Sequence, residues 1–167
     1  DEIEDLEKQV HSAHMEAIQL AEKMSVTRKS VFVSFEEKVQ SILQSLGMKN
    51  ARFSISHENI GLTESGIDKI QFLFSANSNI PVQPIAKVAS GGELSRLMLT
   101  IKYLISEAAG LPTIIFDEID TGVSGEIADK VGRLIKEMAA NMQVINITHL
   151  PQVASKGDHH YLVYKEA

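Results

Sequence analysis

The sequence contains no cysteine, which excludes disulfide bonds and thiolate metal sites and is compatible with a reducing cytoplasm. No apolar run approaches the length that spans a bilayer, and the first residues lack the basic-then-apolar pattern of a signal peptide. The sequence therefore predicts no membrane partner. An excess of positive charge is also lacking: the formal net charge is −6, which argues against coating nucleic acid through bulk charge. Any contact with DNA is then local, or is made elsewhere in the protein.

The sequence also lacks a phosphate-binding loop of the form Gly-x-x-x-x-Gly-Lys-Ser/Thr. What is present is 167 residues with 44% hydrophobic content, enough for a small domain with a core plus an extended arm. The first residue is Asp1 and not methionine. We therefore expect the chain to be one piece of a longer protein.

Residues 1–48 predict a long helix that forms a coiled-coil arm and ends at Gly47. Apolar residues recur at intervals of three or four as a heptad seam, weaken after Met24 and then resume. An ordinary amphipathic surface helix is the alternative. A seam requires a partner helix, which either another part of the protein or a second copy must supply. The seam comprises Ile3, Leu6, Val10, Ala13, Ala17, Leu20, Met24, Val31, Phe35, Val39, Ile42 and Leu46.

Two histidines on this helix, His11 and His14, have a spacing that can chelate a metal. No acidic residue or cysteine stands in an obvious third position, so we interpret them as solvated helix histidines. From position 51 the pattern changes to strands, because Phe53 and Ile55 alternate with polar neighbours and a second apolar run follows at 70–74. Glycine turns between the two runs predict an antiparallel pair.

A glycine-rich turn at positions 90–93, Ser-Gly-Gly-Glu, opens a stretch with the apolar spacing of a helix. The start of such a helix presents backbone N–H groups and the positive end of the helix dipole, which suits a phosphate. An ordinary N-terminal cap and turn is the alternative interpretation.

A short apolar run at 113–116 ends in two adjacent carboxylates, Asp117 and Glu118. It predicts a buried strand, and paired carboxylates rarely follow such a strand without a function. A second run at 143–147 predicts another buried strand, and a helical pattern lies between the two. This parallel β-α-β unit should bring His149 to the same sheet edge as the carboxylates, where open α/β sheets bind ligands. Three ionisable groups would converge there.

Beyond this unit, the sequence predicts a short helix from Pro151 and a final strand through Tyr161, Val163 and Tyr164. The final strand would complete the layer formed by the two strands before it. We therefore expect a mixed α/β domain that follows a long helix.

The order and spacing of these motifs resemble those of the ABC-type ATPases. Positions 90–93 resemble the signature motif, 114–118 the Walker B strand with its catalytic glutamate, and 120–122 the D-loop. His149 resembles the switch histidine. Glu93 and the long helix before the head resemble the SMC-like DNA-repair branch, because transporters usually have glutamine at the fourth signature position.

Longer stretches, at 89–96, 117–125 and 148–154, are similar to the SMC-like ATPases of bacterial double-strand-break repair. The resemblance implies an α/β fold: the C-terminal lobe of an ABC/SMC-type P-loop ATPase head with parallel core strands, preceded by a long coiled-coil helix. Residues 1–48 would be the arm and 49–167 the C-terminal half of the head. In this family the phosphate loop lies near the N-terminus, beyond an arm that folds back, which would explain its absence here.

The resemblance also implies roles for the residues at the sheet edge. Asp117 would hold Mg²⁺, Glu118 would be the general base that activates water, and His149 would sense or stabilise the γ-phosphate of ATP. The protein would then be an ATPase of bacterial recombinational DNA repair, cytoplasmic and nucleoid-associated, with DNA as its partner. Without the phosphate loop, this chain alone should be inactive.

Other residues would act across a homodimer of ATP-bound heads. Asp120 would contact the opposite head. ATP binding would then hold two heads together, and ATP hydrolysis would let them separate. The face meant for the rest of the head and the open seam should both expose apolar surface. The signature residues that would meet ATP held by the second head are Ser90, Gly91, Gly92 and Glu93.

Three alternatives stay open from the sequence. Chromosome-organising SMC ATPases are near relatives, but their D-loop typically has alanine and Leu-Asp where this chain has Thr-Gly-Val-Ser at 121–124. A non-catalytic scaffold with a relic head is disfavoured by the intact Glu118 and His149. A transporter's nucleotide-binding subunit is disfavoured by the arm and by Glu93.

Overall fold

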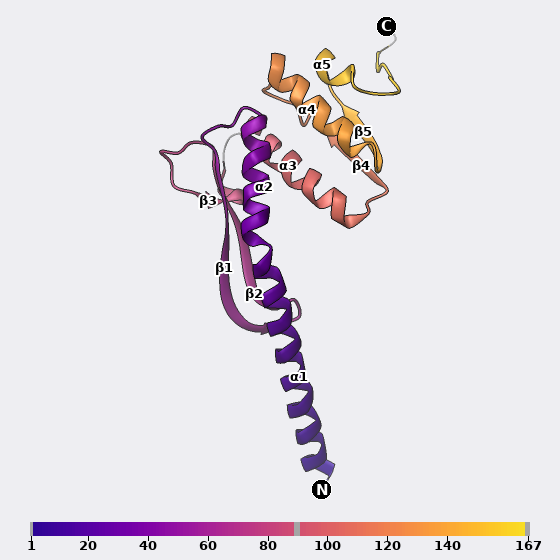
Figure 1. Cartoon of the computed structure of the whole chain (residues 1–167). Coiled ribbons are helices and arrows are strands. Elements are labelled where there is room, and N and C mark those ends of the chain that lie inside the picture. The colour runs from indigo at the N-terminus through magenta and orange to yellow at the C-terminus, as the bar shows by residue number, and fades with distance from the viewer. Residues whose placement is uncertain (1, 89–90, 166–167) are drawn as a thin grey trace.

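The computed structural model describes residues 2–88 and 91–165. A long helix, α1, projects from a head of helices and strands, and the N-terminus lies at its far end (Figure 1). None of the helices in the described ranges is long and apolar enough to cross a membrane. The elements follow the order α1 (Glu2–Ser30), α2 (Phe32–Ser45), β1 (Arg52–Thr63), β2 (Gly66–Ser75), β3 (Gln83–Pro84), a 3₁₀ turn (Ile85–Lys87), α3 (Gly91–Ala109), β4 (Thr113–Asp117), α4 (Gly125–Met138), β5 (Gln143–Ile147) and α5 (Pro151–Ala154).

The N-terminal helical region is interrupted at Val31, between α1 and α2. Just before the break, Thr27 Oγ1 donates to the Lys23 carbonyl (3.1 Å) and Ser30 Oγ to that of Thr27 (2.8 Å). Such side-chain bonds compete with the helix backbone. The chain leaves α2 through Gly47, whose φ of +83° is the left-handed conformation of a helix C-cap, as the sequence predicts.

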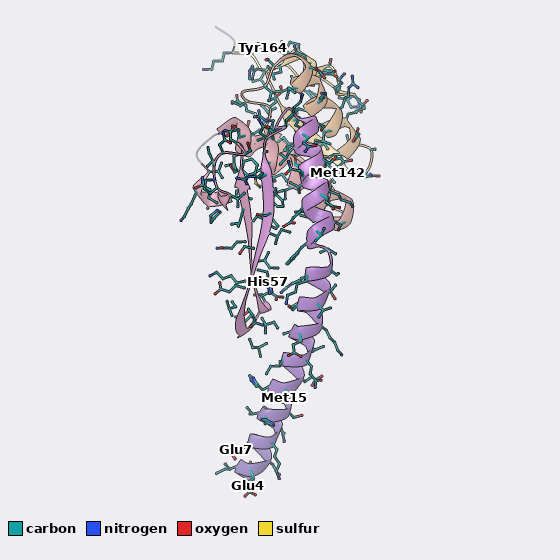
Figure 2. The ribbon with its side chains drawn as sticks, turned by 60° about the vertical axis from the view of Figure 1, so that its left-hand side comes forward. Glu4, Glu7, Met15, His57, Met142 and Tyr164 are labelled. Carbon is teal, nitrogen blue, oxygen red and sulfur yellow. The ribbon has the colours of Figure 1, made fainter. Side chains whose placement is uncertain are left out.

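The two parts of the heptad seam have different environments. In α1 the buried residues are Ala21 and Ser25, whereas seam residues such as Leu6 and Val10 are exposed. Figure 2 shows Glu7 and Met15 on the part of α1 that extends beyond the hairpin. In α2 the seam continues into the head, where Val39 is fully buried. The outer part of the seam is therefore uncovered, as expected, while the inner part belongs to the head core.

Strands β1 and β2 form the predicted antiparallel hairpin, with Phe53 opposite Phe74 in the register. Helix α2 packs against it, and the Phe35 ring stacks on that of Phe72 at 6.0 Å between centroids. Helix α3 closes this core with side chains from one of its faces. The buried members are Val39, Leu43, Met48, Ala51, Phe53, Phe74, Leu97 and Ile101.

A second core lies between α3, α4 and the parallel pair β4–β5, which confirms the predicted β-α-β unit. Helix α5 packs closely on α4, because a Cβ at Gly132 would lie 3.2 Å from Val153 Cα. Helix α3 contributes Leu99 to this core and Leu97 to the other, so it connects the two. The buried members are Leu46, Leu99, Ile114, Phe116, Ala128, Val131, Ile135, Met138 and Val153.

Two expectations about the strands are wrong. The pair β4–β5 is not fully buried as predicted but is buried on one face only, because Ile115, Ile145 and Ile147 remain 62%, 44% and 52% exposed. This open face agrees with the other expectation, that the chain exposes an apolar surface. The expected final strand does not form: the described residues after α5 contain no strand, and Tyr161 and Val163 are almost fully exposed. Alternating apolar residues become a strand only beside an edge to which they can hydrogen-bond, and this segment pairs with neither β4 nor β5.

The buried carboxylate of Asp68 joins the arm to the hairpin. It accepts hydrogen bonds from Ser25 Oγ (2.6 Å) and Arg28 Nη1 (3.2 Å) on α1, and it pairs with His57 Nε2 (2.6 Å) on β1. Figure 2 shows His57 on the hairpin, beside the helix. These bonds, that from Ser25 first, lower the pKa of Asp68 to about 2. Asp68 therefore holds α1 against the head next to the break at Val31.

We predict that Asp68→Asn destabilises the chain at pH 7 by about 5 °C in Tm. Because folding lowers the pKa of Asp68, the stabilisation is complete above the ordinary value of 3.8 and is lost as the pH falls towards 2. Thermal unfolding across this range should show the variant and the parent converging at low pH. Glu58→Gln is the matched control, because its exposed pair with Lys69 contributes little. Equal loss in both variants would contradict the assignment.

Candidate functional site

The carboxyl ends of β4 and β5 bring three predicted site residues to one edge. Asp117 ends β4 opposite Ile147, which ends β5, and the Glu118 N–H donates to the Ile147 carbonyl at 3.0 Å. Glu118 and His149 thus follow neighbouring strands at the same edge. All three ionisable side chains, those of Asp117, Glu118 and His149, are exposed. The edge is accessible to a ligand, in the position that parallel sheets use for binding.

Glu118 is held in an uncommon backbone conformation. Its φ is +48°, in the left-handed region that residues other than glycine rarely adopt. The Thr121 N–H and hydroxyl both donate to the Glu118 carbonyl, at 3.1 and 2.8 Å, and close a tight turn after β4. Backbone strain that its surroundings maintain is common at functional sites. This local geometry supports a functional role for the side chain that the turn presents.

Asp120 lies inside the head. Its side chain is fully buried, and Oδ2 accepts a hydrogen bond from Thr148 Oγ1 on the loop after β5. The other carboxylate oxygen, Oδ1, is buried with no hydrogen-bond partner in the described part of the chain. The expected contact of Asp120 with a second head stays a prediction. Sequence reasoning missed Thr148, because only the fold places its hydroxyl against a carboxylate 28 positions away.

The start of α3 packs against the turn after β4. A Cβ at Gly92 would lie 3.1 Å from the Thr121 carbonyl oxygen and 3.8 Å from Gly122 Cα, so only a residue without a side chain fits easily here. Gly91, by contrast, is exposed, and a Cβ there would meet no atom within 4 Å. Glu93 is half-buried, and Ser90 lies outside the described residues. The structure thus brings the glycine-rich helix start beside the carboxylate loop.

The edge fits a metal that arrives with a phosphate better than a metal caged by protein. In the described ranges, no three histidine or acidic side chains are arranged to hold an ion by themselves. Asp117 offers one exposed carboxylate. Mg²⁺ commonly binds one or two carboxylates and completes its shell with waters and substrate phosphates. The donor set at β4 is therefore compatible with Mg²⁺.

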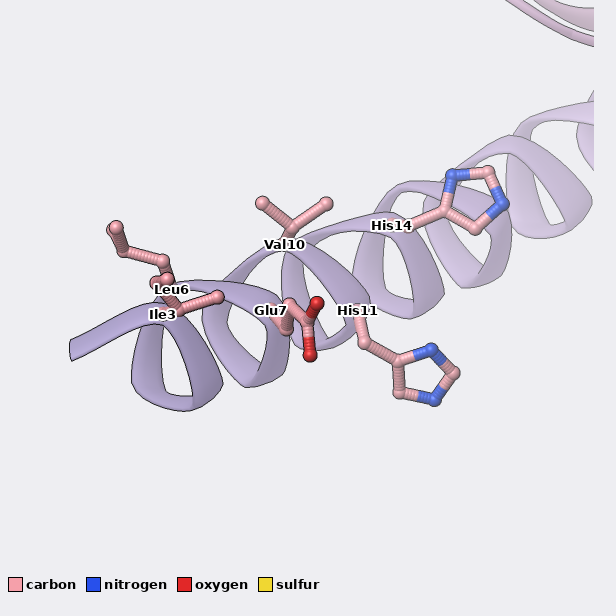
Figure 3. Close-up of a pocket in the computed structure, with 6 residues that line it drawn as sticks. All are labelled: Ile3, Leu6, Glu7, Val10, His11 and His14. Atoms are coloured by element: carbon pink, nitrogen blue, oxygen red, sulfur yellow. The ribbon is translucent and has the colours of Figure 1, made fainter. Parts of the chain in front are cut away.

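A hollow on α1 lies far from this edge, near the N-terminus of the arm (Figures 1 and 3). Figure 3 shows the His11 and His14 rings pointing in different directions, which does not suit a shared metal. The hollow belongs to the uncovered seam of a single helix, so we interpret it as a helix-packing surface and not as a substrate pocket. Its lining residues are Ile3, Leu6, Glu7, Val10, His11 and His14.

Comparison with solved structures identifies the fold. The fold matches a Pyrococcus furiosus Smc head domain with an extended coiled coil, bound to the C-terminal domain of ScpA, at a TM-score of 0.66 and 20% identity over 93% of this chain and 38% of that one. A structure described as "Structural biochemistry of ATP-driven dimerization and DNA stimulated activation of SMC ATPases" matches with a TM-score of 0.54 and 23% identity. The match covers 79% of this chain and 77% of that one. The chain has the fold of the C-terminal lobe of an ABC/SMC-type ATPase head.

Comparison of sequences is more specific, although no family model matches. The chain is 36% identical to the DNA repair protein RecN of Halalkalibacterium halodurans over 171 residues, which is 99% of this chain and 30% of that protein. It is 44% identical to RecN of Rickettsia typhi over 147 residues, which is 87% of this chain and 26% of that protein. The chain is thus a relative of RecN, and it spans about 30% of the length of the curated relatives it matches.

Proposed function

We propose that this chain is the C-terminal half of an ATP-hydrolysing head in a protein of DNA double-strand-break repair. The supporting observation is the sheet edge that gathers Asp117, Glu118 and His149 beside the glycine-rich start of α3. The likeness to RecN, a DNA repair protein, gives this edge its biological context. The DNA partner and a place at the bacterial nucleoid belong to the same proposal.

At this edge each residue has a proposed chemical role. Asp117 would hold Mg²⁺, which would supply positive charge beside the phosphates of ATP. Glu118 orients the attacking water and accepts its proton, which suits an exposed carboxylate at the first residue of a fixed turn. His149 donates a hydrogen bond to the γ-phosphate from the neighbouring strand end.

The start of α3 acts on ATP held by a second head. Gly91 is exposed and is the first residue of the 19-residue helix α3, so its backbone N–H and the positive dipole end are available to a phosphate. The SMC ATPases named above are described as dimerising under ATP. We propose the same for this protein, as a homodimer that tethers DNA. Gly92 and Glu93 would complete the contact, and Ser90, which lies outside the described residues, keeps the same proposed role. The Asp120 loop would also contact the other head, with the Asp120 side chain still bonded to Thr148 in its own head.

This chain by itself should not hydrolyse ATP, because its 167 residues contain no phosphate-binding loop of the form Gly-x-x-x-x-Gly-Lys-Ser/Thr. The test compares phosphate release by this chain with release by the same chain combined with the remaining head sequence of the whole protein. We expect turnover only in the combination. Turnover by the chain alone, at a rate that Glu118→Gln abolishes, would overturn the proposal.

A further inference from the structure

We infer that Thr148 is a positioning residue, which ties Asp120 to the loop carrying His149 so that the loops after β4 and β5 keep one geometry. The inference rests on the proposed function for its effect on turnover. The link itself rests on the hydrogen bonds and burial of Asp120 and Thr148.

The Thr148 hydroxyl bridges two partners. It donates to Asp120 Oδ2 and accepts from the Leu150 N–H at 3.0 Å, which uses its single donor and one of its acceptor sites. His149 lies between Thr148 and Leu150, so the hydroxyl fixes the backbone on both sides of the histidine. The direction of the His149 side chain therefore depends on a group that itself need not touch ATP.

The same bridge restrains Glu118. The Glu118 N–H already bonds to the carbonyl of Ile147, the residue before Thr148. Asp120, two positions after Glu118, is the second connection between the loops, through Thr148. The segment Glu118–Asp120 and the segment Ile147–Thr148 are therefore joined by two hydrogen bonds, one at each end. Neither loop can turn without breaking one of them.

Burial makes the second connection strong. The Asp120 side chain has no exposed surface, and its Oδ1 finds no partner in the described ranges, so Thr148 is its one side-chain donor there. A buried carboxylate that loses its donor is costly, and hydrogen bonds gain strength where water is excluded. The pair therefore resists separation, and a small displacement at the reacting groups is enough to slow catalysis.

The test replaces Thr148 in the whole protein by valine, which keeps the branched shape but removes the hydroxyl, and by serine, which keeps it. We expect Thr148→Val to lower kcat by roughly 10–100-fold while KM changes by less than about 3-fold. Thr148→Ser should restore most of the loss. Asp120→Asn combined with Thr148→Val should be little worse than Thr148→Val alone, because the two side chains act as one unit.

Thr113→Val is the matched control, because Thr113 Oγ1 joins β4 to β5 through Gln143 at the opposite end of the same pair (3.1 Å). We expect wild-type kcat in this variant. Unchanged kcat in Thr148→Val, equal loss in Thr148→Ser, or equal loss in the Thr113 control would overturn the inference.

A second readout needs no turnover and separates this inference from the proposed function. In Asp120→Ala the Thr148 hydroxyl loses its carboxylate partner, so hydrogen exchange at the Leu150 amide, which that hydroxyl accepts from, should accelerate by roughly 10-fold or more without ATP. Unchanged exchange at Leu150 would refute the link even in an active enzyme. Faster exchange in a protein that never hydrolyses ATP would preserve the link and refute the proposed function.

Discussion

Replacing Glu118 by glutamine in the whole protein should abolish ATP turnover, by a factor of about 10²–10⁴, while ATP still brings two heads together. Glutamine has nearly the same shape but cannot accept the proton of the attacking water. The turn that carries position 118 is held by backbone groups, so the substitution should leave the site's geometry intact. Phosphate release and sedimentation with ATP measure the two effects separately.

Glu126→Gln is the control for this prediction. Glu126 is an exposed glutamate at the start of α4, paired with Lys130 at 2.7 Å, and it belongs to the same head. Its replacement should alter turnover by less than about 2-fold, because exposed pairs contribute little. Near-normal turnover in Glu118→Gln would remove the general base from the proposed mechanism. A failure of Glu118→Gln to dimerise with ATP would contradict the proposal that bound ATP holds the two heads together.

The uncovered face of β4–β5 should make this chain self-associate. Ile115, Ile145 and Ile147 are large apolar side chains on one exposed face, and covering three such residues stabilises a complex by on the order of 5 kcal/mol. Threonine at all three positions keeps the β-branched shape that strands favour and makes the face polar. We expect the triple variant to associate at least about 100-fold more weakly, by light scattering over a range of concentrations.

The arm provides a second route to association, so it needs its own variant. Lysine at Leu6 and Val10 makes the exposed seam unsuitable for helix pairing without touching the head. If the seam variant becomes monomeric while the triple threonine variant still associates, the sheet face is not the main contact. A parent chain that stays strictly monomeric at high concentration would contradict both the open sheet face and the coiled-coil arm.

The parallel unit around the site could be predicted from the sequence because its signals are local. Two short, mainly apolar runs flank a helical pattern, and connection rules then place Asp117, Glu118 and His149 on one edge. What covers the strands could not be predicted, since periodicity shows which residues are apolar but not which surface meets them. The same limit explains the final segment, where Tyr161 and Val163 alternate like a strand but have no edge to join.

Two of the features missed in the sequence depend on long-range contacts, and two are local. The Thr148 bridge joins residues 28 positions apart, and the Asp68 cluster joins α1 to a strand 40 or more positions away. The positive φ of Glu118 follows from its fixed turn and not from its residue type. The break at Val31 was only partly visible, as a weakening of the seam by serine and threonine before it.

In the proposed mechanism, each ATP site is completed by the partner head. Mixing two inactive variants of the whole protein before ATP is added tests this directly. Glu118→Gln disables the base, and Gly91→Asp places a negative charge at the start of α3, where a Cβ would have no atom of the described residues within 4 Å. Gly91→Ala is the uncharged control. In a mixed dimer, one of the two sites keeps both an intact base and an intact signature.

If half of the dimers are mixed and the sites work independently, we expect mixing to restore about a quarter of the wild-type turnover. A mixture as inactive as its two components would show that each head acts with its own signature, and sites shared between heads would be refuted.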